Sequence, residues 1–390
     1  MSEKPEKLRF LKEELSERKS AHQFRKLNAA EPDLTSCSIL KSGKKLINFC
    51  SNDYLGLASH PEVIKRSAEF LTKYGAGATA SRLVSGNFTI HENLEQKITE
   101  TFGYESALLF NTGFQANATV LATVANRNSL IIADKKVHNS LLQGAVLSRA
   151  DFKRFPHNDM QSLESMLRSG RGKSYNRIWI ITETLFSMDG DRNDLDQLIH
   201  LSNKYEALLY SDDAHAIGVF GDRGLGFNYG KNGIDISVGT FGKSFGSFGA
   251  FIGCSAEMKD YLINFCAGFI YSTALPPAVI GALDAATELI PTMENERKQL
   301  HQNIEKVLIS LKEFGFDTGA SNSQIIPVIT GSEERTISLE KWLEDQGIWA
   351  SAIRPPTVEK GASRIRITLT DKHSPDDIDR LIQAFREWNP

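Results

Sequence analysis

The 390-residue sequence has few cysteines, no long apolar run and little net charge. Its four cysteines are scattered, with no Cys-x-x-Cys pair and no matched histidines, which predicts reduced thiols and no metal site. The most apolar stretch, 274–290, is interrupted by Pro276 and Pro277, so we expect no membrane span. A net charge of −3 gives no reason to expect nucleic acid or an anionic membrane as a partner. We therefore expect a soluble, cytoplasmic protein.

Short apolar segments alternate with segments of helical period along most of the chain. The segments 61–74 and 91–102 each place apolar residues on one helical face. Strands are predicted at 106–110, 130–134, 178–183, 207–212, 236–240 and 249–254. This alternation is typical of an α/β fold with a mostly parallel sheet and crossover helices.

The pattern changes near residue 290. A long polar helix, a strand at 325–329 and an alternating strand at 363–370 follow, and a final helix begins after Ser374, which reads as its N-cap. The first 19 residues mix charges of both signs with leucines, which indicates an exposed amphipathic helix. We therefore divide the chain into an N-terminal helical arm (1–43), a large α/β domain (44–289) and a small α+β domain (290–390).

Polar residues follow the predicted strands at the ends where parallel sheets bind ligands. Glu183, Asp212, His215, Thr240 and Lys243 all lie at or just after such ends. Each of them alone is more typical of a cap, a turn or a solvated charge. Together they suit pyridoxal 5′-phosphate (PLP), because an acid can keep the pyridine nitrogen protonated, a histidine can bond the phenolic oxygen and a lysine can form the imine.

The phosphate group and the flat ring of PLP would need further contact residues in the protein. The turn at 111–115 precedes a helix expected to start near Ala116, so its backbone N–H groups, with Gly113 allowing close approach, are candidates for binding a phosphate. Hydroxyl donors could come from Ser187, Thr240, Ser272 and Thr273. His138, after the strand at 130–134, could stack on the ring, although a histidine there is more often structural.

Several motifs resemble one known family. The similar segments, in chain order, are Ser51–Gly56, Gly75–Gly86, Glu183–Asp191, Asp212-x-Ala-His215 and Thr240-x-Gly-Lys243. In this combination the chain, from about Arg25 to its end, resembles the α-oxoamine synthases. These are fold-type I PLP enzymes that condense an amino acid with an acyl thioester and release carbon dioxide.

The resemblance implies roles for individual residues. Lys243, His138, Asp212 and His215 would be catalytic and would also contact PLP, together with Gly113, Phe114, Glu183, Ser187, Thr240, Ser272 and Thr273. Substrate contacts would come from Arg25, Asn52, His138, Arg354, Thr357 and Arg366. The arginines would hold the carboxylates of the two substrates, and the resemblance does not assign a particular arginine to a particular carboxylate. The family also implies a homodimer, with Ser272 and Thr273 reaching the phosphate of the neighbouring subunit.

The segment 352–358, followed by Arg364-Ile365-Arg366, resembles the biotin-pathway branch of the family. That branch joins L-alanine to a pimeloyl thioester, whose carrier is coenzyme A or acyl carrier protein. Three alternatives share parts of this pattern: a glycine C-acetyltransferase with the same cofactor residues, an aminotransferase, and a PLP-binding regulator without catalysis. The order of motifs disfavours the aminotransferase, and the regulator would need a DNA-binding extension that the sequence lacks.

Overall fold

The computed structural model describes residues 6–389, and these divide into two compact units. The larger unit comprises Asn52–Ser187 and Asp191–Gln299. The smaller unit comprises the described residues up to Ser51, the short segment Met188–Gly190, and the residues from Leu300 onward.

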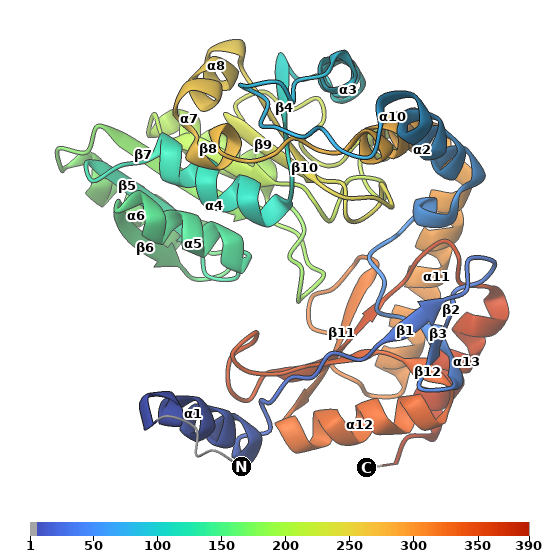
Figure 1. Ribbon diagram of the computed structural model, residues 1–390. Coiled ribbons are helices and arrows are strands. Elements are labelled where there is room, and N and C mark those ends of the chain that lie inside the picture. The colour runs from blue at the N-terminus through green and yellow to red at the C-terminus, as the bar shows by residue number, and fades with distance from the viewer. Residues whose placement is uncertain (1–5, 390) are drawn as a thin grey trace. The chain divides into compact units, whose positions relative to one another are not determined.

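A seven-stranded sheet organises the larger unit (Figure 1). Its strands, in spatial order, are β4 (Ser106–Phe110), β10 (Ala250–Cys254), β9 (Ile236–Thr240), β8 (Leu208–Asp212), β7 (Arg177–Glu183), β5 (Ser129–Asp134) and β6 (Asp151–Phe155). β10 runs antiparallel to both of its neighbours, and the other pairs are parallel. The six strands expected from the sequence are present, whereas β6 was missed because its charged residues leave it largely exposed.

Helices cover both faces of this sheet. They are α2 (Pro61–Tyr74), α3 (Thr89–Phe102), α4 (Gly113–Val124), α5 (Asn139–Ser148), α6 (Met160–Arg171), α7 (Leu195–Lys204), α8 (Ala256–Phe265), α9 (Ala267–Ile270) and α10 (Pro277–Leu289). Alternate residues of each strand enter different cores: Ile131 packs in a core with α4 and α5, and Ile132 in one with α6 and α7. Although far apart in sequence, α2 and α10 lie side by side (Figure 1) and are joined by an ion pair between Arg66 and Asp284.

The smaller unit contains two small sheets and the remaining helices. Its strands pair in the orders β1 (Ala30–Pro32), β2 (Ser38–Lys41), β3 (Lys44–Asn48), β12 (Ile348–Trp349) and β11 (Ile325–Gly331), β14 (Ser363–Thr368), β13 (Ser351–Ile353). Its helices are α1 (Arg9–Ser20), α12 (Glu333–Asp345) and α13 (Pro375–Glu387), and α11 (Glu294–Glu313) begins in the larger unit and ends here. As predicted, Ser374 caps α13, in a capping box with Asp377.

Two parts of the smaller unit differ in detail from expectation. The helix expected over the first 19 residues is present as Arg9–Ser20, with no residue of that range buried, while residues 1–5 lie outside the described residues. Strands at 30–32 and 38–41 follow it, so the predicted arm is helical over only part of its length. In β14, Arg364 and Arg366 do alternate with Ile365 and Ile367, but both sets are buried. The alternation therefore marks two faces of β14 that are both covered.

Acid should weaken the smaller unit through His373. This buried ring stacks on Phe49 with centroids 4.1 Å apart, and burial lowers its pKa to about 4. In the unfolded chain this histidine has a pKa near 6.5, so between about pH 6.5 and 4 the unfolded chain binds a proton that the folded chain does not bind. The free energy of unfolding therefore falls as the pH drops through this range. His373→Phe should reduce the slope of unfolding free energy against pH in this window by one proton, as measured by urea unfolding. An unchanged slope would contradict the assignment.

Candidate cofactor site

The carboxyl ends of β7, β8 and β9 bring the predicted polar residues to one edge of the large sheet. Glu183 pairs directly with Asp212, and Asp212 pairs with Val238, two residues before Thr240. Since these strands are neighbours and parallel, Glu183 and Asp212 lie next to each other although they are 29 positions apart in sequence. The expectation that these side chains share one edge is therefore met.

Neutral donors hold the Asp212 carboxylate. Asn117 Nδ2 on α4 donates to its Oδ2 at 2.7 Å, and the backbone N–H of Ala214 donates to its Oδ1 at 3.0 Å. Asn117 is itself oriented by the hydroxyl of Tyr210, which donates to its Oδ1 at 2.9 Å. These contacts fix the direction of a buried acid without pairing its charge with a cation, which suits a pyridinium partner. Asn117 is not among the residues predicted from sequence, and its signal is its place one turn after Gly113 on the same helix.

His138 and Glu183 form a second part of the cluster. His138 is the N-cap of α5, where its Nδ1 lies 2.7 Å from Ser140 Oγ and its backbone N–H donates to Glu183. Burial lowers the pKa of His138, while the charge of Asp212 raises it and that of Lys243 lowers it. Burial, reinforced by Asp212 and opposed by Lys243, raises the pKa of Glu183 to about 8. The raised pKa favours the protonated form of the Glu183 carboxyl, which limits the negative charge beside Asp212.

The third part joins His215 to the start of the larger unit. His215 is buried, and its Nδ1 lies 2.6 Å from the hydroxyl of Tyr54. That hydroxyl also donates to Asn52 Oδ1 at 3.3 Å. Tyr54 thus links two predicted site residues that are 163 positions apart, although it is not itself among the residues predicted from sequence.

A phosphate would fit at the start of α4. The helix begins at Gly113, three residues earlier than expected, because Thr112 caps it by accepting from the Gln115 N–H at 3.0 Å. The amides of Gly113 and Phe114 are therefore in the first turn, where the helix itself offers no acceptor. A Cβ at Gly113 would lie 2.5 Å from Thr240 Cγ2. Gly113 and Thr240, both candidates for the phosphate site, are therefore in close contact. The Thr240 hydroxyl oxygen is buried and has no hydrogen-bond partner among the described residues, as expected of a donor awaiting a ligand.

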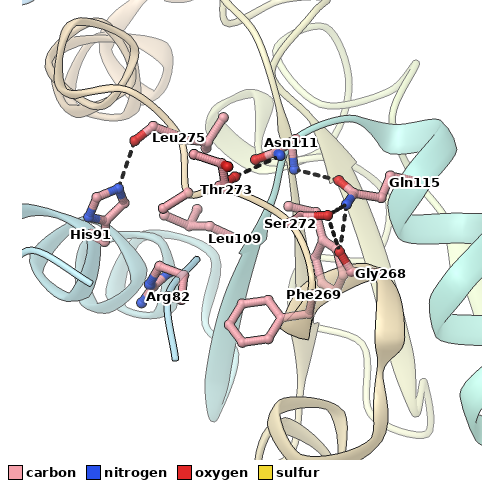
Figure 2. A pocket seen from close by; sticks show the side chains of 12 residues that line it. Arg82, His91, Leu109, Asn111, Gln115, Gly268, Phe269, Ser272, Thr273 and Leu275 are labelled. Atoms are coloured by element: carbon pink, nitrogen blue, oxygen red, sulfur yellow. Dashed lines mark hydrogen bonds between the residues drawn. The ribbon is translucent and has the colours of Figure 1, made fainter. Parts of the chain in front are cut away.

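Ser272 and Thr273 line a neighbouring pocket (Figure 2). Gln115 Nε2 donates to Ser272 Oγ at 2.6 Å, and Asn111 Nδ2 donates to the Thr273 carbonyl at 2.9 Å. Both hydroxyl residues are therefore tied to the turn that starts α4. Ser187, the remaining hydroxyl candidate, is buried and its backbone N–H donates to Glu183.

Lys243 lies on the turn between β9 and β10 and is half-buried. The turn closes through a hydrogen bond from the Gly246 N–H to the Lys243 carbonyl at 2.8 Å. Gly246 has φ +63°, and a Cβ there would lie 2.1 Å from the backbone nitrogen of Ala58. Only glycine fits such an approach, so this residue determines the path of the chain around Lys243.

Gly246→Ala should therefore destabilise the larger unit by more than about 3 kcal/mol, since it adds a backbone clash to an unfavourable φ. Gly230→Ala is the matched control, because Gly230 has φ +71° and a Cβ there would meet no described atom within 4 Å. That variant should lose only about 1 kcal/mol. Urea unfolding of both variants measures the difference, and equal losses would show that the close approach to Ala58 is unimportant.

The predicted substrate residues other than Asn52 and His138 belong to the smaller unit. Arg25 Nη2 donates to Thr357 Oγ1 at 2.8 Å across 332 positions of sequence, and Arg354 Nη1 donates to the carbonyl of His22. Arg25, Arg354 and Thr357 are therefore close together. Arg366 lies on β14 and is buried, with its Nη1 donating to Thr368 Oγ1 at 2.7 Å.

Comparisons with known proteins identify the family to which the chain belongs. Residues 44–385 match the family model for aminotransferase class I and II. A protein of Desulfosudis oleivorans, provisionally named 8-amino-7-oxononanoate synthase, is 46% identical over 382 residues, which are 98% of this chain and 99% of that protein. The 8-amino-7-oxononanoate synthase of Citrifermentans bemidjiense is 44% identical over 342 residues, or 86% and 87% of the two chains.

A solved structure of SPT with a PLP internal aldimine has a TM-score of 0.91 at 27% identity, covering 97% of this chain and 96% of that one. By sequence and by fold, the chain belongs to the aminotransferase class I and II family and, within it, to the α-oxoamine synthases, which are fold-type I PLP enzymes.

Proposed function

We propose that the protein condenses L-alanine with a pimeloyl thioester to give 8-amino-7-oxononanoate, carbon dioxide and the free thiol. The observation that carries this proposal is the segment 352–358 with Arg366, together with relatives of that name at 44–46% identity over most of the chain. In the reaction, a bond forms between the alanine α-carbon and the acyl carbon, and the C–S bond of the thioester breaks. The alanine carboxylate leaves as carbon dioxide, and a proton returns to the α-carbon.

Bound PLP would supply the electron-withdrawing ring that stabilises negative charge on the α-carbon. Asp212, held by Asn117 and Ala214, would keep the pyridine nitrogen protonated, and His215, held by Tyr54, would donate to the phenolic oxygen. Lys243 would anchor the cofactor and then carry the proton removed from the α-carbon. His138 would cover the ring, and Gly113, Phe114, Ser187 and Thr240 would hold the phosphate.

The two substrates bring two carboxylates, which suit the planar guanidinium groups of Arg25, Arg354 and Arg366. We propose that Arg366, buried on β14, binds one carboxylate while the Arg25–Thr357 pair and Arg354 serve the other. Asn52 would orient the substrate near Tyr54.

The proposal includes a homodimer in the cytoplasm, with Ser272 and Thr273 completing the phosphate site of the second copy. Phe114 and Tyr271, which neighbour these phosphate candidates, are 51% and 84% exposed, and large exposed side chains of this kind are typical of an interface. Among residues 6–389, no helix combines the length and the apolar content that crossing a bilayer requires.

The test supplies the PLP-loaded protein with L-alanine, glycine or L-serine, each with pimeloyl-CoA, pimeloyl-acyl carrier protein or acetyl-CoA. Thiol release and product mass are measured. The expected result is thiol release with L-alanine and a pimeloyl thioester, and a product of the mass of 8-amino-7-oxononanoate. Preference for glycine with acetyl-CoA would assign the protein to glycine C-acetyltransferase chemistry instead, and pyridoxamine phosphate formation would indicate an aminotransferase.

A further inference from the structure

We infer that His157 is a positioning residue: a positively charged ring that ties together the turn after β5 and the turn after β7. The first of these turns leads to His138 and the second carries Ser187. The inference rests on the cofactor contacts proposed above for these two residues. It concerns His157 and Asp134, which lie outside the family-like motifs, and Asp191, which ends the motif Glu183–Asp191 and has no proposed role.

The ring of His157 lies between two carboxylates. Its Nδ1 is 2.9 Å from Asp134 Oδ1, and its Nε2 is 2.7 Å from Asp191 Oδ2. An ionised carboxylate only accepts hydrogen bonds, so each ring nitrogen must carry a proton to bond its partner. Geometry alone therefore indicates the doubly protonated, cationic form of His157.

Asp134 shapes the turn that leads to His138. In addition to His157, its carboxylate accepts from the Lys136 N–H at 2.8 Å and from the Asn158 N–H at 2.9 Å. His138 follows four residues later as the N-cap of α5. Loss of the Asp134 contacts would free the backbone that sets the position of the His138 ring.

Asp191 closes the turn that carries Ser187. Its carbonyl accepts from the Phe186 N–H at 3.0 Å, and its carboxylate reaches His157. The rings of Phe186 and His157 pack in a T-shaped arrangement, with centroids 4.4 Å apart and planes at 88°. The residue before Ser187 is thus fixed from two sides, by the backbone bond to Asp191 and by the ring of His157.

Charge supports the same conclusion. Burial by itself disfavours a cation, but hydrogen bonds and the charges of Asp134 and Asp191 outweigh it and raise the pKa of His157 to about 9. His157 therefore stays charged through the neutral range. A cation with two short, charge-assisted bonds holds both turns more firmly than a neutral ring with one.

The test measures PLP binding to His157→Phe, which keeps an aromatic ring against Phe186 but removes both N–H groups. We expect PLP to dissociate at least ten times more readily than from the unchanged protein, as followed by PLP fluorescence after dilution. Asp191→Asn, which weakens one bond and keeps the shape, should give a smaller loss. His200→Gln, on the exposed part of α7, is the control and should leave PLP binding unchanged.

Ring ¹⁵N NMR at pH 7.5 provides the second readout, because a merely structural histidine need not be cationic. We expect both nitrogens of His157 to be protonated. A neutral ring, or a folded His157→Phe variant with unchanged PLP affinity, would overturn the inference; if that variant does not fold, unchanged affinity in Asp191→Asn would do so. Neither readout uses alanine or a thioester, so a wrong substrate assignment would leave this result standing.

Discussion

Lys243→Ala should abolish turnover, with a loss on the order of 10³-fold or more. The substitution removes both the amine that anchors PLP and the group that carries the α-proton, and proton transfer alone contributes about 10²–10⁴-fold. The visible absorption of lysine-bound PLP should disappear as well, although the cofactor can still bind through its phosphate and ring. Thiol release from the acyl thioester and the absorption spectrum together measure the two effects.

Lys231→Ala is the control for this experiment. Lys231 is exposed in the same unit and pairs with Asp196 at the surface, so its removal should change neither readout. Normal turnover by Lys243→Ala would refute the assignment of Lys243 and, with it, the proposed mechanism.

Asp212→Ala should reduce turnover by about 10²-fold. A charge-assisted hydrogen bond is worth about 1.5–3 kcal/mol, and without it the pyridine nitrogen would no longer stay protonated when negative charge develops on the α-carbon. The substitution also leaves Asn117 Nδ2 without its closest acceptor, at 2.7 Å, inside the core. The rate of α-proton exchange from L-alanine, followed by NMR in D₂O, isolates this effect from thioester binding.

Asn117→Ala is the companion variant, because it leaves the acid in place and removes one of the groups that orient it. We expect a loss of activity between those of the unchanged protein and Asp212→Ala. Asp196→Ala, a surface acid in the same unit, should behave as the unchanged protein. Full exchange activity in Asp212→Ala would mean that another group protonates the ring.

Much of the local structure could be predicted from sequence because it depends on near neighbours. The strands that lead to Glu183, Asp212 and Thr240 are short apolar runs, and the structure places them within a residue of their predicted bounds. The start of α13 follows from Ser374 and Asp377, three residues apart. The start of α4 was placed three residues late because its Thr112 cap was not recognised.

The supports of the site could not be predicted, since they join distant parts of the chain. Asn117 reaches Asp212 across 95 positions, Tyr54 reaches His215 across 161, and His157 joins two aspartates on either side of it. No spacing rule pairs such residues, because their separation in sequence depends on the helices and loops between strands. The same holds for Arg25 and Thr357, 332 positions apart.

The sequence by itself determined the class of fold, the chemistry of the strand-end residues and the likeness to the α-oxoamine synthases. These depend on local periodicity and on which functional groups are present. Only the tertiary structure decided the antiparallel place of β10, the protonated state favoured for the buried Glu183 and the bridging position of His157. Each of these depends on burial and on contacts across strands, which arise when the sheet assembles and are absent from any single segment.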